Sequence, residues 1–541
     1  MSDFFNAVKS AFPKIVVSKP GDADFAALRA SWNVMTQFEP ACVVQPNDAL
    51  QVSEIVKLAN AHGIRKINAR SGGHSFEGSS LGGVEGGGLV VDLVNMRAVH
   101  IDPAKNEAIV ETGALLGHVA QQAWNHGRKM LPTGICVSVG VGGQASCGGY
   151  GMFAKAYGSM TDRIVEAQVV LADGTLVVAN ESQHSDLLWA LKGSGTGSFG
   201  IVTHYRFRLS DAPEHAAKFT FDYALDRIDF PAVFKRMQDF SLRSEKNVTT
   251  MIVGWQGFLE ITGTIVAPSR DALGELIREI EAEFGDSDKT ELLKIDYIDM
   301  VRNIGLTQTS APWYDDLASI RREQDEHLRF MKIKAGFMKE GLSDEAIRQL
   351  AGIAARQNPS GTRFQILSLD PEYSATDAER ASIKARGCPL LMGMSVWIES
   401  DGTSLQAASV AAKQGVNRLN WLNECYELFY PYTVGGYIGD DDLDEWAHGR
   451  DLFDSYYGKH LDRLISIKNR YDPRNVSGTT SASRSRSRAR SEAARVRPAA
   501  RAPRARFGRG ARLIGSAARR RSIRPSRLAR APRWTLRRAS P

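Results

Sequence analysis

Apolar residues recur every three or four positions at Val52, Ile55, Val56 and Ala59. This spacing predicts an amphipathic helix over residues 48–62, with a polar N-cap before it and a glycine after it. Runs rich in valine and isoleucine on either side predict two short strands, the second leading into a glycine-rich loop. These strands are Cys42–Pro46 and Ile64–Ala69. The pattern indicates an α/β unit.

A similar alternation continues to about residue 212. Asp173-Gly174 is a strong hairpin turn between two of the predicted strands. The further strands are Gly88–Leu93, Ala108–Glu111, Ile164–Leu171, Thr175–Ala179 and a strand from Ile201, with helices at Phe25–Asn33, Leu115–His126 and Asp186–Lys192. We therefore expect a lead-in over 1–36 and one domain over 37–212.

The pattern changes after residue 213, where strand-like runs alternate with charged amphipathic helices. This order predicts an antiparallel sheet covered by helices, and so an α+β fold for the whole chain. The predicted strands are Lys218–Tyr223, Thr250–Trp255, Leu259–Ile265, Phe364–Leu369 and Leu390–Trp397, and the predicted helices are Arg270–Phe284, Ser343–Arg356 and Ser404–Leu422. We expect this second domain, over 213–425, to hold a substrate.

The net charge of +7 over 541 residues sums two unlike parts. The stretch 477–541 holds 20 Arg, no Lys and the single acid Glu492, whereas the remainder holds 48 basic and 60 acidic residues. The tail has too little apolar surface to fold, so we expect it to be disordered. It is either a basic arm for nucleic acid or anionic lipid or, as we favour, the product of a shifted reading frame in GC-rich DNA. We expect no nucleic-acid binding by the acidic body.

The N-terminus, Met1–Pro20, carries scattered lysines and no sustained apolar run. This composition predicts neither a signal peptide nor a spanning helix, and hence a cytoplasmic protein. The five cysteines are odd in number and lack metal-ligand spacing, which argues against a disulfide framework and a zinc site. They are Cys42, Cys136, Cys147, Cys388 and Cys425.

Two loops carry the chemistry. In Asn68–Ser75, glycines and small hydroxyls beside an arginine expose backbone N–H groups that can form a nest for an anion such as a pyrophosphate. The second loop, Pro132–Gly143, is as rich in small residues. Each loop has one nucleophilic side chain, His74 or Cys136, among residues too small to hide it.

As whole sequences the loops resemble those of berberine bridge enzyme and the gluco-oligosaccharide oxidases, PCMH-type FAD flavoproteins of the vanillyl-alcohol oxidase superfamily. The segment 432–476 resembles the C-terminal segment of that family, in which the chain returns to the flavin domain; we place this segment at 426–476. The resemblance implies bound FAD, with His74 bonded to the 8α-methyl group and Cys136 to C6 of the ring. Cys147 is a rival thiol, at a position where the family usually has Gly.

The resemblance also implies the other residues that contact FAD. They are Arg70, Ser71, Gly72, Gly73 and Ser75 in the first loop, Val139, Gly140, Gly143 and Gln144 in the second, and Gly148, Gly149, Tyr150, Gly151, Ile201, Val202 and Asn475 beyond them. The glycines at 195, 197 and 200 match Gly-x-Gly-x-x-Gly, but they follow a predicted helix and precede a strand. That order is the reverse of a Rossmann turn.

By the same resemblance, Tyr437 is the expected base for a substrate hydroxyl and Tyr150 its partner. A phenol with a pKa of about 10 needs a neighbour that favours its phenolate. The chain departs from the family at two points. Tyr437-Ile438-Gly439-Asp440 stands where Tyr-x-Asn-Tyr is frequent, and Gln144 stands where His is usual.

Family members with Val at the position of Val139 tend to react with O2, whereas those with Leu tend not to. The resemblance therefore predicts an oxidase that takes hydride from a hydroxyl-bearing oligosaccharide or secondary-metabolite alcohol and releases H2O2. An FAD dehydrogenase or an amine or alkaloid oxidase is one alternative, and a flavin-containing resistance protein that binds a drug without turnover is another. We expect a monomer or homodimer, with no membrane partner and no metal.

Overall fold

The computed structural model describes residues 2–33, 38–82, 87–195, 197–255, 257–305, 328–356, 361–372, 380–400, 418–446 and 449–477. The predicted tail lies outside these ranges except for its first residue, Ser477. Most of the predicted helix 404–422 also lies outside them, and residues 418–429 are helical. No helix within the described ranges is long and apolar enough to cross a membrane. The cytoplasmic location stays a prediction.

The chain begins with a four-stranded sheet in the order β1-β2-β4-β3, in which β2, β4 and β3 run parallel. Its strands are β1 (Val16–Ser18), β2 (Cys42–Gln45), β3 (Ile67–Arg70) and β4 (Leu89–Asp92), and its helices are α1 (Ser2–Ala11) and α3 (Ala49–Ala61). The predicted amphipathic helix is α3, which Asp48 caps by accepting a hydrogen bond from the Gln51 N–H. Its apolar side packs with α1 against β2 and β4.

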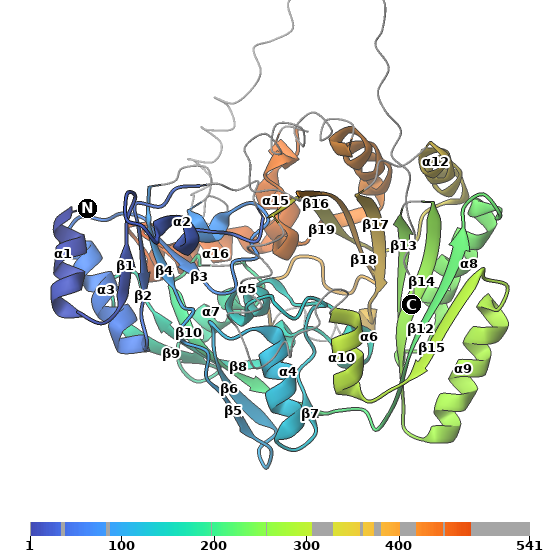
Figure 1. Cartoon of the computed structure of the whole chain (residues 1–541), viewed down its shortest axis with the longest axis horizontal. Helices are drawn as coiled ribbons and strands as arrows, with labels where there is room; N and C mark the ends of the chain where they lie inside the picture. Colours follow the sequence, from blue (N-terminus) through green and yellow to red (C-terminus); the bar gives the residue numbers. More distant parts are fainter. Residues whose placement is uncertain are drawn as a thin grey trace, which may run out of the picture. The chain divides into compact units, whose positions relative to one another are not determined.

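A five-stranded antiparallel sheet follows, in the order β5-β6-β10-β8-β9. Its strands are β5 (Val99–Asp102), β6 (Glu107–Glu111), β8 (Ile164–Val170), β9 (Leu176–Asn180) and β10 (Ile201–Arg208), with helices α4 (Leu116–Asn125), α5 (Val141–Cys147) and α7 (Ser185–Leu191). The predicted hairpin around Asp173-Gly174 is the β8–β9 pair. We call the part of the chain with these two sheets the N-terminal domain (Figure 1).

Strands β7 (Lys129–Met130) and β11 (Ser210–Asp211) pair with each other, and the other strands form one antiparallel sheet in the order β15-β12-β14-β13-β17-β18-β16-β19. They are β12 (His215–Ala224), β13 (Val248–Trp255), β14 (Phe258–Ala267), β15 (Lys289–Lys294), β16 (Leu328–Met338), β17 (Thr362–Ser368), β18 (Leu390–Ser400) and β19 (Thr433–Gly436). Helices α8 (Phe230–Arg243), α9 (Arg270–Phe284) and α12 (Asp344–Ala355) cover one face with a phenylalanine-rich core (Figure 1). The predicted α+β fold is confirmed.

The end of the described chain lies against the N-terminal domain. Helices α15 (Leu452–Tyr457) and α16 (Leu461–Tyr471) join its core, and α16, drawn in orange, packs on α7 (Figure 1). The Ile67 N–H then donates to the Val476 carbonyl at 2.9 Å, and Ser477 pairs with Ile67. Ser477, at the expected start of the tail, is therefore buried and hydrogen-bonded.

Two local predictions were wrong. The predicted lead-in helix Phe25–Asn33 is only α2 (Phe25–Leu28), because the chain then turns so that the Trp32 N–H donates to the Gly73 carbonyl at 3.1 Å. Residues 141–143, expected to end the second glycine-rich loop, instead begin helix α5 (Val141–Cys147). Its buried side, with Val141 and Ala145, stabilises a helix that glycine disfavours.

Candidate active site

The two glycine loops cross at Gly72 and Gly140. A Cβ on Gly72 would lie 2.9 Å from the Gly140 Cα, and one on Gly140 would lie 2.8 Å from the Gly72 Cα. Ser71 fixes the crossing, because its Oγ donates to the Thr112 carbonyl and accepts from the Gly142 N–H at 3.2 Å. Only residues without a Cβ allow this approach of two backbones.

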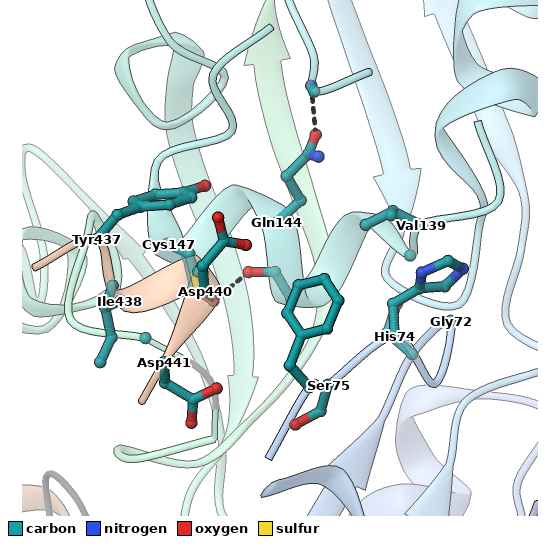
Figure 2. A pocket seen from close by; sticks show the side chains of 18 of the residues that line it. Gly72, His74, Ser75, Val139, Gln144, Cys147, Tyr437, Ile438, Asp440 and Asp441 are labelled. Carbon is teal, nitrogen blue, oxygen red and sulfur yellow. Dashed lines mark hydrogen bonds between the residues drawn. The ribbon is translucent and has the colours of Figure 1, made fainter. Parts of the chain in front are cut away.

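His74 projects from the first loop and is held from two sides. The Trp32 ring stacks on it, with centroids 5.0 Å apart and planes at 21°. Its Nε2 lies 3.0 Å from the Oγ of Ser138, which belongs to the second loop. The Gly73 before it has φ of +74°, a conformation that favours glycine. His74 is therefore oriented beside the loop that carries Cys136 (Figure 2).

Cys136 is exposed, whereas the other four cysteines are buried, and none of the five forms a disulfide. Gln144, on α5, fixes the base of its loop by accepting a hydrogen bond from the Gly134 N–H at 2.9 Å. The rival Cys147 also lines the site, but burial raises the pKa of its thiol to about 12. A thiol so protonated is a poor nucleophile.

The loops face a cavity of about 400 Å³. Thirteen of the predicted site residues line it: Ser71, Gly72, Gly73, His74, Ser75, Cys136, Val139, Gly140, Gly143, Gln144, Tyr150, Val202 and Tyr437. We call its boundary at Ser71–Phe76 and 134–147 the loop wall. The opposite boundary, on the eight-stranded sheet, is the sheet wall, which includes Met251, Ile333, Arg363, Gln365, Leu367 and Ser395.

The other predicted site residues do not line the cavity. They are Arg70, Gly148, Gly149, Gly151, Ile201 and Asn475. The Arg70 guanidinium instead pairs with buried Asp92 at 2.7 Å and donates to the carbonyls of Leu28 and Ala30. Asn475 is exposed on the closing turn of the chain. Their assignment as cofactor contacts stays a prediction.

Three buried hydroxyl groups on the cavity have no hydrogen-bond partner within the described ranges. They belong to Ser80, Ser194 and Tyr205. Buried hydroxyls are normally bonded, so these groups fit a site whose polar contacts come from a bound molecule. Together with the glycine loop at Gly72–Gly73, which the sequence predicts to bind an anion, the arrangement fits a dinucleotide cofactor with an anionic pyrophosphate.

Comparison with known proteins agrees with this geometry. Residues 40–180 match the family model "FAD binding domain", and residues 437–478 match "Berberine and berberine like". Two segments of the chain are thus similar to the FAD-binding and C-terminal segments of berberine bridge enzyme-like FAD-linked oxidoreductases.

The chitooligosaccharide oxidase of Gibberella zeae is 26% identical over 86% of this chain and 91% of its own length. An FAD-linked oxidoreductase of Metarhizium anisopliae is 37% identical, but the alignment covers 49% of this chain and about half, 52%, of that relative. The solved structure of BBE-like 1 from Physcomitrella patens has a TM-score of 0.75 at 24% identity, over 88% of this chain and 99% of that one. This structural likeness shows the fold.

In this chain, Tyr150 and Tyr437 meet at the cavity. Their ring centroids are 5.7 Å apart in an edge-to-face contact, and both rings pack on Phe337. Burial raises the pKa of Tyr150, and it raises that of Tyr437 well above 10. The two tyrosines lie together as predicted, but as protonated phenols.

Four charged or amide side chains of the cavity were not predicted from the sequence. Asp440 and Asp441 line it beside Tyr437, and burial raises the pKa of each carboxyl to about 7. Arg363 and Gln365 lie on β17, where burial lowers the pKa of Arg363. The signal that could have found Arg363 and Gln365 is their spacing of two positions, because alternate residues of a strand point to the same face of the sheet.

Proposed function

We propose that this flavoprotein is an oxidase with FAD attached through both His74 and Cys136. The observation that carries the proposal is that a held imidazole and the exposed cysteine project from two loops that cross at Gly72 and Gly140. Bound FAD would supply a two-electron acceptor for a hydride and would pass the electrons to O2, giving H2O2.

The remaining residues of the loop wall support this assignment. Val139 lines the cavity three residues after Cys136, and its small side chain leaves room for O2. Gln144 holds the Cys136 loop, so this departure from the family pattern has a positioning task. The Cys147 thiol, with its raised pKa, does not compete for the flavin.

The substrate is proposed to be a hydroxyl-bearing compound, either an oligosaccharide or a secondary-metabolite alcohol, that lies between the flavin and the sheet wall. Apolar Met251 and Leu367 flank polar Arg363 and Gln365 on that wall, a mixture that suits a ring bearing hydroxyl groups. The relatives named above include a chitooligosaccharide oxidase. A monomer or homodimer remains the expected assembly.

The first test is of the cofactor. Purified protein is denatured and precipitated with acid, and flavin absorbance is measured in the pellet of wild type, His74→Ala, Cys136→Ala and the double variant. We expect each single variant to keep the flavin in the pellet and the double variant to release it. Flavin that washes out of the wild-type pellet would refute covalent attachment.

The second test is of turnover. Peroxide release is followed over oligosaccharides, secondary-metabolite alcohols and alkaloid amines. Peroxide with a hydroxyl substrate supports the proposal, and peroxide only with amines supports the alkaloid-oxidase alternative. Reduction of the flavin by substrate without peroxide would make the enzyme a dehydrogenase. Tight binding without flavin reduction would support the drug-sequestering alternative.

A further inference from the structure

The contacts of the Tyr437 side chain are those of a structural residue. Its oxygen accepts a hydrogen bond from the Gly149 N–H at 3.3 Å, and its ring lies back over Gly439. A Cβ on Gly439 would come within 2.5 Å of the Tyr437 Cζ and 2.6 Å of its hydroxyl oxygen. The ring thus occupies space that any other residue at 439 would need for its side chain.

Asp440 ends the short 3-10 helix η5 (Ile438–Asp440) and is fixed by its own N–H, which donates to the Tyr437 carbonyl at 3.1 Å. Its carboxylate projects into the cavity next to the Tyr437 ring, whereas Asp441 points away from that ring (Figure 2). Asp440 is thus the acidic side chain that η5 presents to the cavity.

The three consecutive aspartates differ in what they bind. Asp441 accepts from the Ser79 Oγ at 3.1 Å, and Asp442 forms ion pairs with Lys332 at 2.7 Å and with Lys334. Within the described ranges, the Asp440 carboxylate has no hydrogen bond or ion pair. A carboxylate held in place but unbonded in a cavity is available to a bound molecule.

The charged and titratable groups around Asp440 do not neutralise it. It faces the Cys147 thiol, the Tyr437 phenol and the Asp441 carboxyl, and Asp441 in turn faces Glu77 and Lys332. No cation lies beside Asp440 among the residues that the structure describes, and burial raises its pKa to about 7. A base whose pKa is near the working pH is largely deprotonated at that pH and is still basic enough to accept a proton from the substrate.

We propose that Asp440, rather than Tyr437, takes the proton of the substrate hydroxyl. The proton of the O–H group would pass to the Asp440 carboxylate as the C=O bond forms, and bound FAD would supply the acceptor for the hydride released when the adjacent C–H bond breaks. Tyr437 is then a positioning residue that sets the course of η5. The inference rests on the proposed function, since it requires a hydroxyl substrate and a flavin acceptor.

Two departures from the family pattern gain a common explanation. Where Tyr-x-Asn-Tyr is frequent, this chain has glycine at 439 and aspartate at 440. Glycine at 439 admits the folded-back ring of Tyr437, and aspartate at 440 restores a proton acceptor at the cavity. The two substitutions therefore belong together.

The test compares Asp440→Asn, Asp441→Asn and Tyr437→Phe with wild type. The pH dependence of kcat/KM is measured from pH 5 to 9 on the best hydroxyl substrate, and flavin in the acid pellet is measured for every variant. Asp441→Asn is the matched control. The Asp441 carboxyl is next to that of Asp440 in the sequence and its pKa is also raised to about 7, but it accepts a hydrogen bond from Ser79.

Wild-type kcat/KM is expected to rise with pH around an apparent pKa near 7. We call this rising part of the pH profile the limb. Asp440→Asn should keep its flavin, lose the limb and lower kcat/KM at pH 8 by about 100-fold or more, the usual contribution of a general base. Asp441→Asn and Tyr437→Phe should keep the limb. Should Asp440→Asn lose flavin, Asp440→Glu tests the same point, since a restored carboxylate should restore a limb.

Two results would overturn the inference, and they are distinguishable. If Tyr437→Phe abolishes the limb while Asp440→Asn retains it with activity within threefold of wild type, the base is Tyr437 and the proposed function stands. If wild type with bound flavin oxidises no hydroxyl substrate, the proposed function fails and the inference fails with it, a result seen in wild type alone.

Discussion

The loop wall and the sheet wall of the cavity owe their shapes to different kinds of contact. The loop wall is set by backbone groups that approach each other where side chains are absent, as at Gly72 and Gly140. The sheet wall is set by strand register, which places Arg363 opposite Trp255 on one side and Ser395 on the other. The first kind of wall tolerates almost no change of residue, whereas the second keeps its frame when side chains change. The residues of the two walls can therefore change separately.

The largest effect is expected from Gly140→Val, which breaks the loop wall. Its side chain would occupy the position of the Gly72 backbone, so the loops should separate and flavin should be absent from the acid pellet. Gly352→Ala, on α12 with open space around it, is the control and should keep full flavin. A Gly140→Val protein with normal flavin content would show that the crossing is not required.

Arg70→Met should be the next most damaging change, although Arg70 does not line the cavity. It would remove the guanidinium that balances the buried Asp92 carboxylate, at a cost of about 3 kcal/mol or more in unfolding free energy. Urea unfolding measures this cost. Arg227→Met breaks the exposed pair with Asp288 and should cost less than about 1 kcal/mol; equal costs for the two variants would contradict the structural role of Arg70.

On the sheet wall, Arg363→Met should lower kcat/KM by about tenfold, the effect of about 1.4 kcal/mol in transition-state binding, and leave flavin content unchanged. Arg363 donates to Gln365 at 2.6 Å, so both polar residues that β17 contributes to the cavity are affected. Arg348→Met, on the exposed side of α12, is the control and should change neither quantity. Loss of flavin in Arg363→Met would mean that the two walls are not separable.

Stability should report the protonation of Asp440 independently of turnover. Its pKa is raised to about 7 in the folded chain from about 3.9 in an unfolded one, so its stabilising contribution is full below pH 4 and is lost as pH rises through 7. The thermal midpoint of Asp440→Asn should therefore fall less between pH 4 and 8 than that of wild type. Equal slopes would argue against a raised pKa.

The smallest effect is expected from removing residues 478–541, which should leave flavin content and the thermal midpoint unchanged. The cut keeps Ser477, whose N–H donates to Asp472 at 2.8 Å. A truncation after Tyr471 is the contrasting variant, since it also removes Asp472 and the pairing with Ile67, and it should lower both quantities. Flavin loss on removing 478–541 alone would give the tail a role in the fold.

The sequence predicted the parts of the molecule whose causes are local. The cap at Asp48, the turn at Asp173-Gly174 and the two glycine loops are each written in a few neighbouring residues. Helix α5 was missed because its stabilisation comes from burial of Val141 and Ala145, which glycine spacing does not reveal. The ion pair of Arg70 with Asp92 was not predicted, because the two residues are 22 positions apart in the sequence.

The same reasoning explains what was missed at the cavity. Arg363 and Gln365 reach it only through the pairing of β17 with β13 and β18, a long-range result. Asp440 was visible as a departure from the family pattern, but its task depends on the direction that the Tyr437 ring takes over Gly439. Local sequence patterns predict neither long-range strand pairing nor the direction of a side chain.

Asn33 connects the His74 loop to the eight-stranded sheet. Its side-chain amide donates to the carbonyls of Phe76 and Met331, each at 2.7 Å, and accepts from the Met331 N–H at 3.1 Å. The strand before the loop, β3, is completed by Val476 and Ser477. During synthesis on the ribosome, the surroundings of His74 are thus completed only when nearly all of the described chain has emerged. A nascent chain cut short before Val476 would lack the finished pocket, so binding of the flavin would report that synthesis had passed residue 477 and that this part of the chain had folded.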